Sequence, residues 1–310
     1  MAVALADTGL LAGAVVLAAL GGEAFLRAIV GAAGAFRVPK AVVATTLAAC
    51  ATSSPEMVVS TVAALSGAPQ IGLGDALGSN VANIALIFGL ALLFAPVRAA
   101  AGGLGADYTL ALAAPLLTFL FLMDGVLSRA EALLLLAVFA GWLIWTVRAA
   151  HASRSGARET SASTLPVGRI VLFGLFGLAC LMLAGRLFVL GASGVAASFG
   201  VGGYVVGVLL VAFGTSLPEL VTVLLSRLRG HDDIGVGTLI GSNLFNGLAI
   251  VGVAGLIHPI AVPRAEVALT LACGVVALLL LRPNADGLIG RGRGVLLLLL
   301  YAGFVWGTLQ

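Results

Sequence analysis

The stretch that decides the fold is Thr52-Ser53-Ser54-Pro55-Glu56, followed at positions 78–83 by Gly-Ser-Asn-Val-Ala-Asn. A second stretch repeats it: Thr215-Ser216-Leu217-Pro218-Glu219 is followed at positions 241–246 by Gly-Ser-Asn-Leu-Phe-Asn. Each stretch places a carboxylate, a proline and small hydroxyl residues inside an apolar run, where such groups are costly. We therefore interpret the two stretches as the two halves of one polar site.

The composition indicates an integral membrane protein. Of the 310 residues, 61% are hydrophobic and 9% are charged, and the mean hydropathy is +1.19, whereas a soluble domain carries roughly 25% charged residues. Apolar stretches long enough to cross a hydrocarbon core of about 30 Å recur along the chain, which predicts a helical bundle and not a β-barrel. The net charge of +3 comes from basic residues in short loops, so no nucleic acid partner is expected.

The predicted fold class is an all-α membrane protein with ten transmembrane helices. The apolar runs lie near residues 8–33, 38–66, 71–96, 107–124, 127–147, 167–196, 201–228, 234–257, 263–281 and 293–309. No Lys or Arg precedes the first run, so we expect a span there and not a cleaved leader. The polar residues 151–166 predict a cytoplasmic linker between a first five-helix repeat, residues 1–150, and a second, residues 167–310.

The basic residues predict the orientation in the membrane. With the amino terminus outside, twelve Lys and Arg residues fall at inner loops and span ends, and two, Arg129 and Arg264, fall at outer ones. This is a clear positive-inside bias. Both termini are therefore expected outside a plasma membrane, which in a prokaryote is the inner membrane.

The two polar stretches belong to a longer internal repeat. A shift of 163 residues aligns positions 38–90 with 201–253, and 21 of these 53 pairs are identical. Matches of Pro, Glu and Asn are not expected by chance in membrane helices. Five spans separate the copies, and this odd number turns the second copy upside down. Such inverted repeats are typical of secondary transporters, whose substrates bind near the midplane where the repeats meet.

Glu56 and Glu219 form the centre of the predicted site. The rise of a helix places each glutamate near the middle of its span, where a charged side chain costs at least about 2.5 to 3.5 kcal/mol. No Lys or Arg lies at that depth. Bound cations or protons must therefore balance the two carboxylates.

The groups around both glutamates that could bind an ion carry oxygen atoms. Pro55 and Pro218 cannot donate to the carbonyls of Ala51 and Gly214, which predicts broken helices 2 and 7 with free carbonyl groups. Hydroxyl and amide side chains recur at helical spacing beside each glutamate and on the following span. No sulfur or imidazole ligand accompanies them, so the sequence favours Ca²⁺ or Na⁺ over zinc or copper.

The motif pair resembles the α-repeats of the cation/calcium exchanger superfamily, and most closely the compact prokaryotic sodium/calcium exchangers. The resemblance covers the whole ten-span plan and implies a transporter, not an enzyme, with no cofactor. It implies the following ion ligands: the carboxylates of Glu56 and Glu219, hydroxyl or carbonyl oxygens of Thr52, Ser53, Ser79, Thr215, Ser216 and Ser242, backbone carbonyls of Ala49 and Ala212, and polar groups of Asn83 and Asn246.

Two departures from the family pattern matter in this chain. Ala51 and Ser54 stand where the family usually has Gly and Leu, so the first half is expected to flex differently. Some members carry Asp at the position of Asn246. With Asn there, the site has two formal negative charges, which balance one Ca²⁺ and disfavour potassium co-transport.

Other polar residues receive structural interpretations. Glu23 and Arg27, four residues apart, are expected to form an ion pair. Asp75, one turn before Ser79, is expected to be a solvated acid near a helix start, with attraction of cations toward the site as the alternative. The widely spaced cysteines, Cys50, Cys180 and Cys273, are expected to be packing residues.

These features predict a secondary antiporter in which the inward Na⁺ gradient expels Ca²⁺ by alternating access, with the first and sixth spans moving against the rest. Ca²⁺/H⁺ exchange stays open, because buried carboxyls can take up protons in place of Na⁺. A passive cation channel is a weaker alternative, since the sequence has no continuous polar ring. The expected partners are Ca²⁺, Na⁺ and the lipid bilayer. The oligomeric state is left open, with a monomer as the working expectation.

Overall fold

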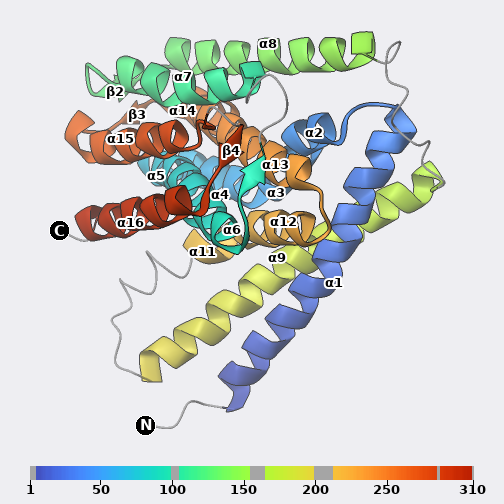
Figure 1. The fold of residues 1–310 in the computed structure, drawn as a ribbon. Coiled ribbons are helices and arrows are strands. Elements are labelled where there is room, and N and C mark those ends of the chain that lie inside the picture. Colours follow the sequence, from blue (N-terminus) through green and yellow to red (C-terminus); the bar gives the residue numbers. More distant parts are fainter. Residues whose placement is uncertain (1–4, 99–104, 154–164, 199–211, 285–286, 309–310) are drawn as a thin grey trace.

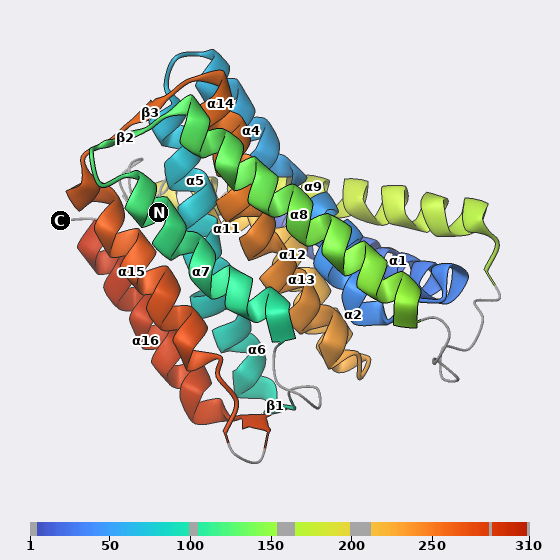
Figure 2. The same ribbon diagram turned by 90° about the horizontal axis from the view of Figure 1, so that it is seen from above.

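The structure is a computed structural model that describes residues 5–98, 105–153, 165–198, 212–284 and 287–308. Nearly all of these residues are helical (Figures 1 and 2). The predicted class of helical membrane protein is therefore confirmed. Residues 201–211 of the seventh predicted span and residues 154–164 of the predicted linker lie outside the described residues.

The first half begins with a long helix, α1 (Leu5–Phe36). The second predicted span consists of four pieces, which are α2 (Lys40–Val43), the π-helix η1 (Ala44–Ala48), α3 (Ala49–Thr52) and α4 (Ser54–Leu65). The third consists of α5 (Pro69–Val81), the π-helix η2 (Ala82–Phe88) and α6 (Gly89–Phe94). The strand β1 (Val97–Arg98), α7 (Gly105–Phe121), β2 (Val126–Leu127) and α8 (Arg129–Ser153) complete this half.

The second half follows the same order. It begins with α9 (Val167–Ser198), and its broken helix is described from α11 (Ala212–Thr215) through α12 (Leu217–Leu228). The next helix is divided into α13 (Asp232–Leu244), the π-helix η4 (Phe245–Ile250) and α14 (Val251–Ile257). The remaining elements are β3 (Ile260–Ala261), α15 (Arg264–Leu280), β4 (Leu288–Ile289) and α16 (Arg291–Thr308).

The internal repeat is visible in the element boundaries. Helices α12 and α13 begin at Leu217 and Asp232, each 163 residues after the starts of α4 and α5, and η4 begins 163 residues after η2. The two halves also contact each other reciprocally. The side chain of Asn80 donates to the Asn243 carbonyl at 3.1 Å, and that of Asn243 donates to the Asn80 carbonyl at 3.4 Å. Reciprocal contacts between equivalent positions are what a two-fold relation produces.

The short strands cross between the halves. β1 pairs with β4 in antiparallel register, with Val97 opposite Ile289, and β2 pairs with β3, with Leu127 opposite Ile260. Each half therefore contributes one strand to each two-stranded ladder. The main hydrophobic core lies between the halves, around α5, η2, α13 and η4, where Leu73, Ile84, Leu244 and Leu248 are fully buried.

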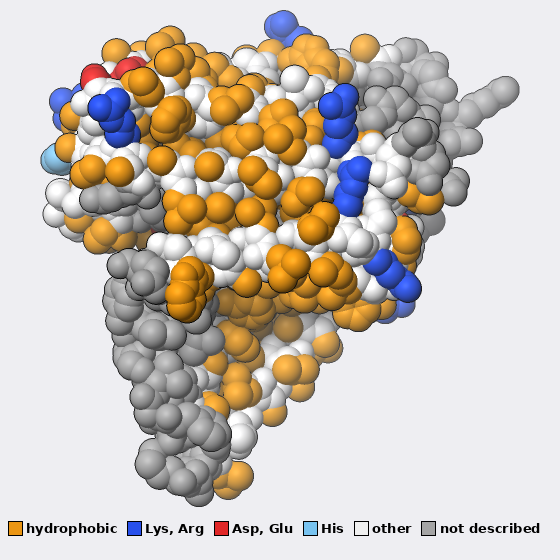
Figure 3. All heavy atoms as spheres, turned by 60° about the vertical axis from the view of Figure 1, so that its left-hand side comes forward, with side chains coloured by type: hydrophobic (Ala, Val, Ile, Leu, Met, Phe, Trp, Pro, Cys, Tyr) orange, Lys and Arg blue, Asp and Glu red, His pale blue; other side chains and the backbone are white. Residues whose placement is uncertain are grey.

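Several helices have the length and hydropathy of membrane spans. Among the described residues, five helices qualify, and a sixth if the pair Lys40–Thr52 and Ser54–Leu65, bent by 46°, counts as one span. Large apolar side chains face outward on many helices, for example Leu120 at 62%, Leu299 at 63% and Trp306 at 69% exposure. In Figure 3 hydrophobic side chains cover most of the visible face, and Lys and Arg lie toward its margins. Such a surface is suited to lipid.

Helices α1 and α9 form a separate pair at one side of the molecule (Figures 1 and 2). Gly21 and Gly177 let the two backbones touch, because a Cβ on Gly177 would lie 2.7 Å from the carbonyl oxygen of Gly21. Close packing through small residues is a common way for membrane helices to associate. The pair contacts the remaining helices mainly through α12 and α11.

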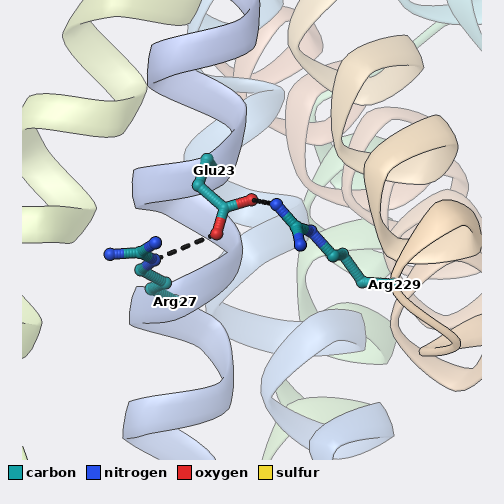
Figure 4. Close-up of polar contacts among 3 residues, drawn as sticks. All are labelled: Glu23, Arg27 and Arg229. Carbon is teal, nitrogen blue, oxygen red and sulfur yellow. Dashed lines mark hydrogen bonds and ion pairs between the residues drawn. The ribbon is translucent and has the colours of Figure 1, made fainter.

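A cluster of charges joins this pair to α12 (Figure 4). Glu23 of α1 accepts a hydrogen bond from Arg27 at 3.0 Å, so the predicted ion pair is confirmed. The second carboxylate oxygen of Glu23 accepts from Arg229, directly after α12, at 2.7 Å. The contact to Arg229 was not expected from the sequence, because the two residues are 206 positions apart.

Candidate cation site

Both predicted helix breaks are present, and they share one conformation. Ser53 separates α3 from α4 with φ −86° and ψ 12°, and Ser216 separates α11 from α12 with φ −85° and ψ 8°. Pro55 and Pro218 lie in the first turn of α4 and α12, where a missing N–H removes no bond from the helix interior. The prolines therefore start the second part of each broken helix.

One consequence drawn from the prolines is wrong. The carbonyl of Ala51 was expected to be free, but a backbone N–H at the end of α3 donates to it, and so does the Ser54 hydroxyl at 2.6 Å. The leucine at the equivalent position of the second half, Leu217, has no hydroxyl. The two breaks thus differ in the hydroxyl that accompanies the first one.

The two glutamates are deeply buried, each with 1% of its surface exposed. Glu56 lies in the first turn of α4 and Glu219 in the first turn of α12. The Oε1 atom of Glu219 accepts from Ser53 at 3.1 Å and from Ser242 at 3.4 Å. Because Ser53 belongs to the first half and Glu219 to the second, the structure brings the two predicted half-sites together.

The candidate residues on α5 and α13 are buried as well. Ser79 and Asn83 are 5% and 1% exposed, and Ser242 and Asn246 are fully buried. Each asparagine is the second residue of a π-helix, Asn83 in η2 and Asn246 in η4. π-helical turns are rare and occur frequently at functional sites. The hydrophobic pattern of the sequence did not predict these turns, and only their position directly after the two Gly-Ser-Asn motifs could have suggested them.

The backbone ligands implied by the family resemblance flank the breaks. Ala49 is fully buried at the start of α3, and its carbonyl accepts from the Thr52 hydroxyl at 3.3 Å. Ala212 is the first residue of α11, and Thr215, half-buried, is its last. Ser216 is 3% exposed.

Buried polar atoms without a hydrogen-bond partner gather in this region. Within the described chain they include Oε2 of Glu56 and Glu219, the Ser216 hydroxyl, Oδ1 of Asn83, and both side-chain polar atoms of Asn246. Leaving such atoms unpaired costs about 1 to 3 kcal/mol each. Oxygen-rich groups of this kind are the ligands that Na⁺ and Ca²⁺ prefer, so the arrangement fits a hard cation as a transported substrate.

Carboxylates alone do not make up this site. No group of three or more His, Cys, Asp or Glu side chains with the geometry of a metal site occurs in the part of the chain that the structure describes. A cation between Glu56 and Glu219 would therefore take its remaining ligands from hydroxyl, amide and carbonyl oxygens. This composition differs from the sulfur- and imidazole-rich sites of zinc proteins.

Asp75 differs from its expected surroundings. Its side chain is half-buried, and Oδ2 is shielded from solvent without a hydrogen-bond partner in the described residues. Asp75 lies in α5, one helical turn before Ser79. The interpretation as a solvated acid is therefore wrong. The equivalent residue in the second half, Thr238, is fully buried and also lacks a partner among the described residues.

Comparison with known proteins identifies the family. The model for the sodium/calcium exchanger protein family matches residues 7–148 and 169–310. The chain is 34% identical over 275 residues to the inner membrane protein YrbG of Escherichia coli, covering 84% of each chain. It is 28% identical to the sodium/calcium exchanger MaX1 of Methanosarcina acetivorans, over 92% of this chain and 93% of that one. The solved structure of the sodium/calcium exchanger from Methanococcus jannaschii superposes with a TM-score of 0.82 and 27% identity, over 97% of this chain and 98% of that one. This chain therefore belongs to the sodium/calcium exchanger protein family.

Proposed function

We propose that this protein is a secondary antiporter that exchanges Na⁺ for Ca²⁺ by alternating access. The observation that carries the proposal is the hydrogen bond from Ser53 of one half to Glu219 of the other, beside the equally buried Glu56. Two carboxylates in a dry site need compensating positive charge. One Ca²⁺ supplies that charge, and so do two Na⁺ ions.

Competition for the same oxygens would couple the two ions. In this proposal Ca²⁺ and Na⁺ compete for the carboxylates of Glu56 and Glu219, so one kind of ion leaves before the other binds. The ligands that we propose are those implied by the family resemblance. The unpaired atoms of Ser216, Asn83 and Asn246 support this set, because a bound ion would satisfy them.

We further propose that the chain forms ten spans in two inverted five-helix repeats. The equal spacing of helix starts and the reciprocal bonds of Asn80 and Asn243 support this plan. Both termini would then lie outside the cell, as the positive-inside bias indicates. The name of the relative YrbG supports the bacterial inner membrane as the location. A monomer would suffice, because the proposed ligands all come from one chain.

Alternating access would involve the pair α1 and α9. These two helices pack mainly on each other and meet the site-bearing helices chiefly through α11 and α12. Movement of such a pair against the rest would open the site first to one side and then to the other. The alternative of Ca²⁺/H⁺ exchange uses the same geometry, with protons on the glutamates in place of Na⁺.

Calcium uptake into vesicles distinguishes these functions. Vesicles with the reconstituted protein are loaded with Na⁺, with acid, or with neither, and ⁴⁵Ca²⁺ uptake is followed. Uptake that requires internal Na⁺ supports the proposal. Uptake driven by a pH gradient and indifferent to Na⁺ would establish proton exchange, and uptake without any counter-ion would establish a channel.

The ligand assignment has its own test. Glu56→Gln and Glu219→Gln keep the shape of the side chain but remove its charge, and each should abolish uptake. Asp124→Asn is the matched control, because Asp124 lies in a loop and bonds only the backbone of Val126 among the described contacts. Exchange at the normal rate in either glutamate variant would disprove the assignment.

A further inference from the structure

A pocket of about 260 Å³ lies between α9 and the two helix breaks. Its walls include Pro55 and Pro218, one from each break, and apolar side chains of α9 such as Met182 and Leu190. Both of these α9 side chains are exposed, so the rim of the pocket lies on a surface suited to lipid. Among the described residues that line the pocket, Arg186 is the one that carries a charge.

Arg186 lies beside the second break. The backbone of its neighbour, Gly185, packs directly on this break, because a Cβ on Gly185 would collide with the carbonyl group of Gly214. Gly214 is five residues before Glu219. The expectation that no Lys or Arg lies level with the two glutamates is therefore wrong. A guanidinium at this depth of a membrane is costly unless an anion or water accompanies it.

Arg186 has no anionic partner in the part of the chain that the structure describes. None of the ion pairs or side-chain hydrogen bonds among the described residues includes it. The equivalent residue of the first half, 163 positions earlier, is Glu23, which is paired with both Arg27 and Arg229. Asp7 of α1 packs against a more distant part of α9. The charge of the first half is thus satisfied by protein groups, and its counterpart on α9 is not.

We propose that this pocket binds one long-chain fatty acid from the lipid phase. The guanidinium of Arg186 pairs with the carboxylate, to which arginine donates two parallel hydrogen bonds. The hydrocarbon chain lies on the apolar walls. At about 260 Å³ the pocket is smaller than the roughly 300 to 1,000 Å³ of pockets for drug-sized ligands, so it suits one chain better than the two chains of a phospholipid.

An occupant of this pocket affects the parts that alternating access would move. The pocket is bounded by α9 on one side and by Pro55 and Pro218 of the two breaks on the other. A bound chain fills the space between them and hinders movement of α9 against the breaks, so it should slow exchange. Only this consequence rests on the proposed function.

Photolabelling measures the binding without transport. The full-length protein in phosphatidylcholine vesicles is irradiated with a palmitate analogue that carries a diazirine in its chain, and mass spectrometry locates the adduct. The wild type should be labelled on α9 between Met182 and Leu190, and excess palmitate should remove the label. Hexadecanol, which has the chain without the charge, should not compete.

Four variants make the result specific. Arg186→Gln should reduce this labelling about tenfold, the change expected when a charge-assisted pair is lost, whereas Arg186→Lys keeps the charge and should retain most of it. Leu190→Trp fills the pocket and should reduce the labelling by a similar factor. Arg169→Gln is the matched control, because Arg169 is an exposed arginine in the first turn of the same helix, and it should leave the labelling unchanged.

Several results would overturn the inference. They are wild-type labelling of Arg186→Gln, label spread evenly over the lipid-facing helices, and competition by hexadecanol. Competition by phosphatidylglycerol as strong as that by palmitate would overturn the assignment to a single-chain lipid.

Calcium uptake tests the consequence for transport. Palmitate should slow ⁴⁵Ca²⁺ uptake by the wild type and by Arg169→Gln but not by Arg186→Gln, each compared with its own rate without palmitate. Uptake by the wild type that palmitate did not slow would disprove the inhibitory effect. A protein that exchanged no calcium would leave the photolabelling intact, so failure of the proposed function and failure of this inference are distinguishable.

Discussion

Replacing Gly241 with alanine tests whether the close contact between α13 and the first half sets the geometry of the site. Gly241 faces η1 and α3, and a Cβ there would lie 2.7 Å from the Cβ of Ala49 and closer still to the carbonyl oxygen of Thr45. Ordinary contact begins near 3.4 Å. The contact with the Thr45 oxygen is the tighter one, so helix α13 must retreat by about 1.3 Å.

This displacement should affect both stability and ion binding. Overpacking of this kind costs about 1 to 3 kcal/mol. Ser242, the next residue, donates to Glu219 at 3.4 Å, already near the limit of a hydrogen bond, so a shift of this size breaks the contact. A hydrogen bond to a charged group contributes about 1.5 to 3 kcal/mol, and its loss should weaken apparent calcium affinity about tenfold or more.

Calcium uptake and thermal unfolding in detergent measure the two effects. The control is Gly141→Ala in α8, where no atom of the described chain lies within 4 Å of the added Cβ. That variant should retain the wild-type affinity and melting temperature. If Gly241→Ala also kept the wild-type calcium affinity, the role assigned to the contact between α13 and η1 would be refuted.

Three other predictions follow from the contacts described above. Asn80→Ala and Asn243→Ala should each lower the free energy of unfolding by about 0.5 to 1.5 kcal/mol, because each removes a side-chain donor to the other residue's backbone carbonyl; unchanged melting temperatures in both variants would contradict these contacts. Asp75→Asn should weaken apparent calcium affinity about threefold to tenfold, because a carboxylate one helical turn before Ser79 attracts a cation that approaches the site; an unchanged affinity would remove Asp75 from the path of the ion. Glu23→Gln and Arg229→Gln should change the maximal exchange rate by similar factors without changing the calcium affinity, since both remove the ion pair that joins α1 to the end of α12. A changed calcium affinity would mean that this ion pair is part of the ion site.

The sequence predicted the course of the helices well where a single physical cause dominates. The lengths of the apolar runs located the spans. For example, the segment from α5 to α6 ends at Phe94, and the span predicted there ends at residue 96. Proline located the breaks to within two residues, at Ser53 and Ser216. Burial of Glu56 and Glu219 followed from the cost of charge in an apolar run.

Features that depend on neighbours distant in the chain were not predictable. The π-helices around Asn83 and Asn246 leave no separate mark on hydrophobic periodicity, because they alter the helix over only a few residues. The burial of Asp75 depends on how neighbouring helices pack around α5.

The two-residue strands have a consequence for how the chain is assembled. β1 with β4 and β2 with β3 each join one half of the chain to the other, and Asn80 with Asn243 does the same in the interior. None of these contacts depends on the covalent connection between α8 and α9. Two polypeptides, each carrying one half, should therefore co-assemble into an active heterodimer when they are expressed together, whereas each half alone would expose the unpaired edges of its strands.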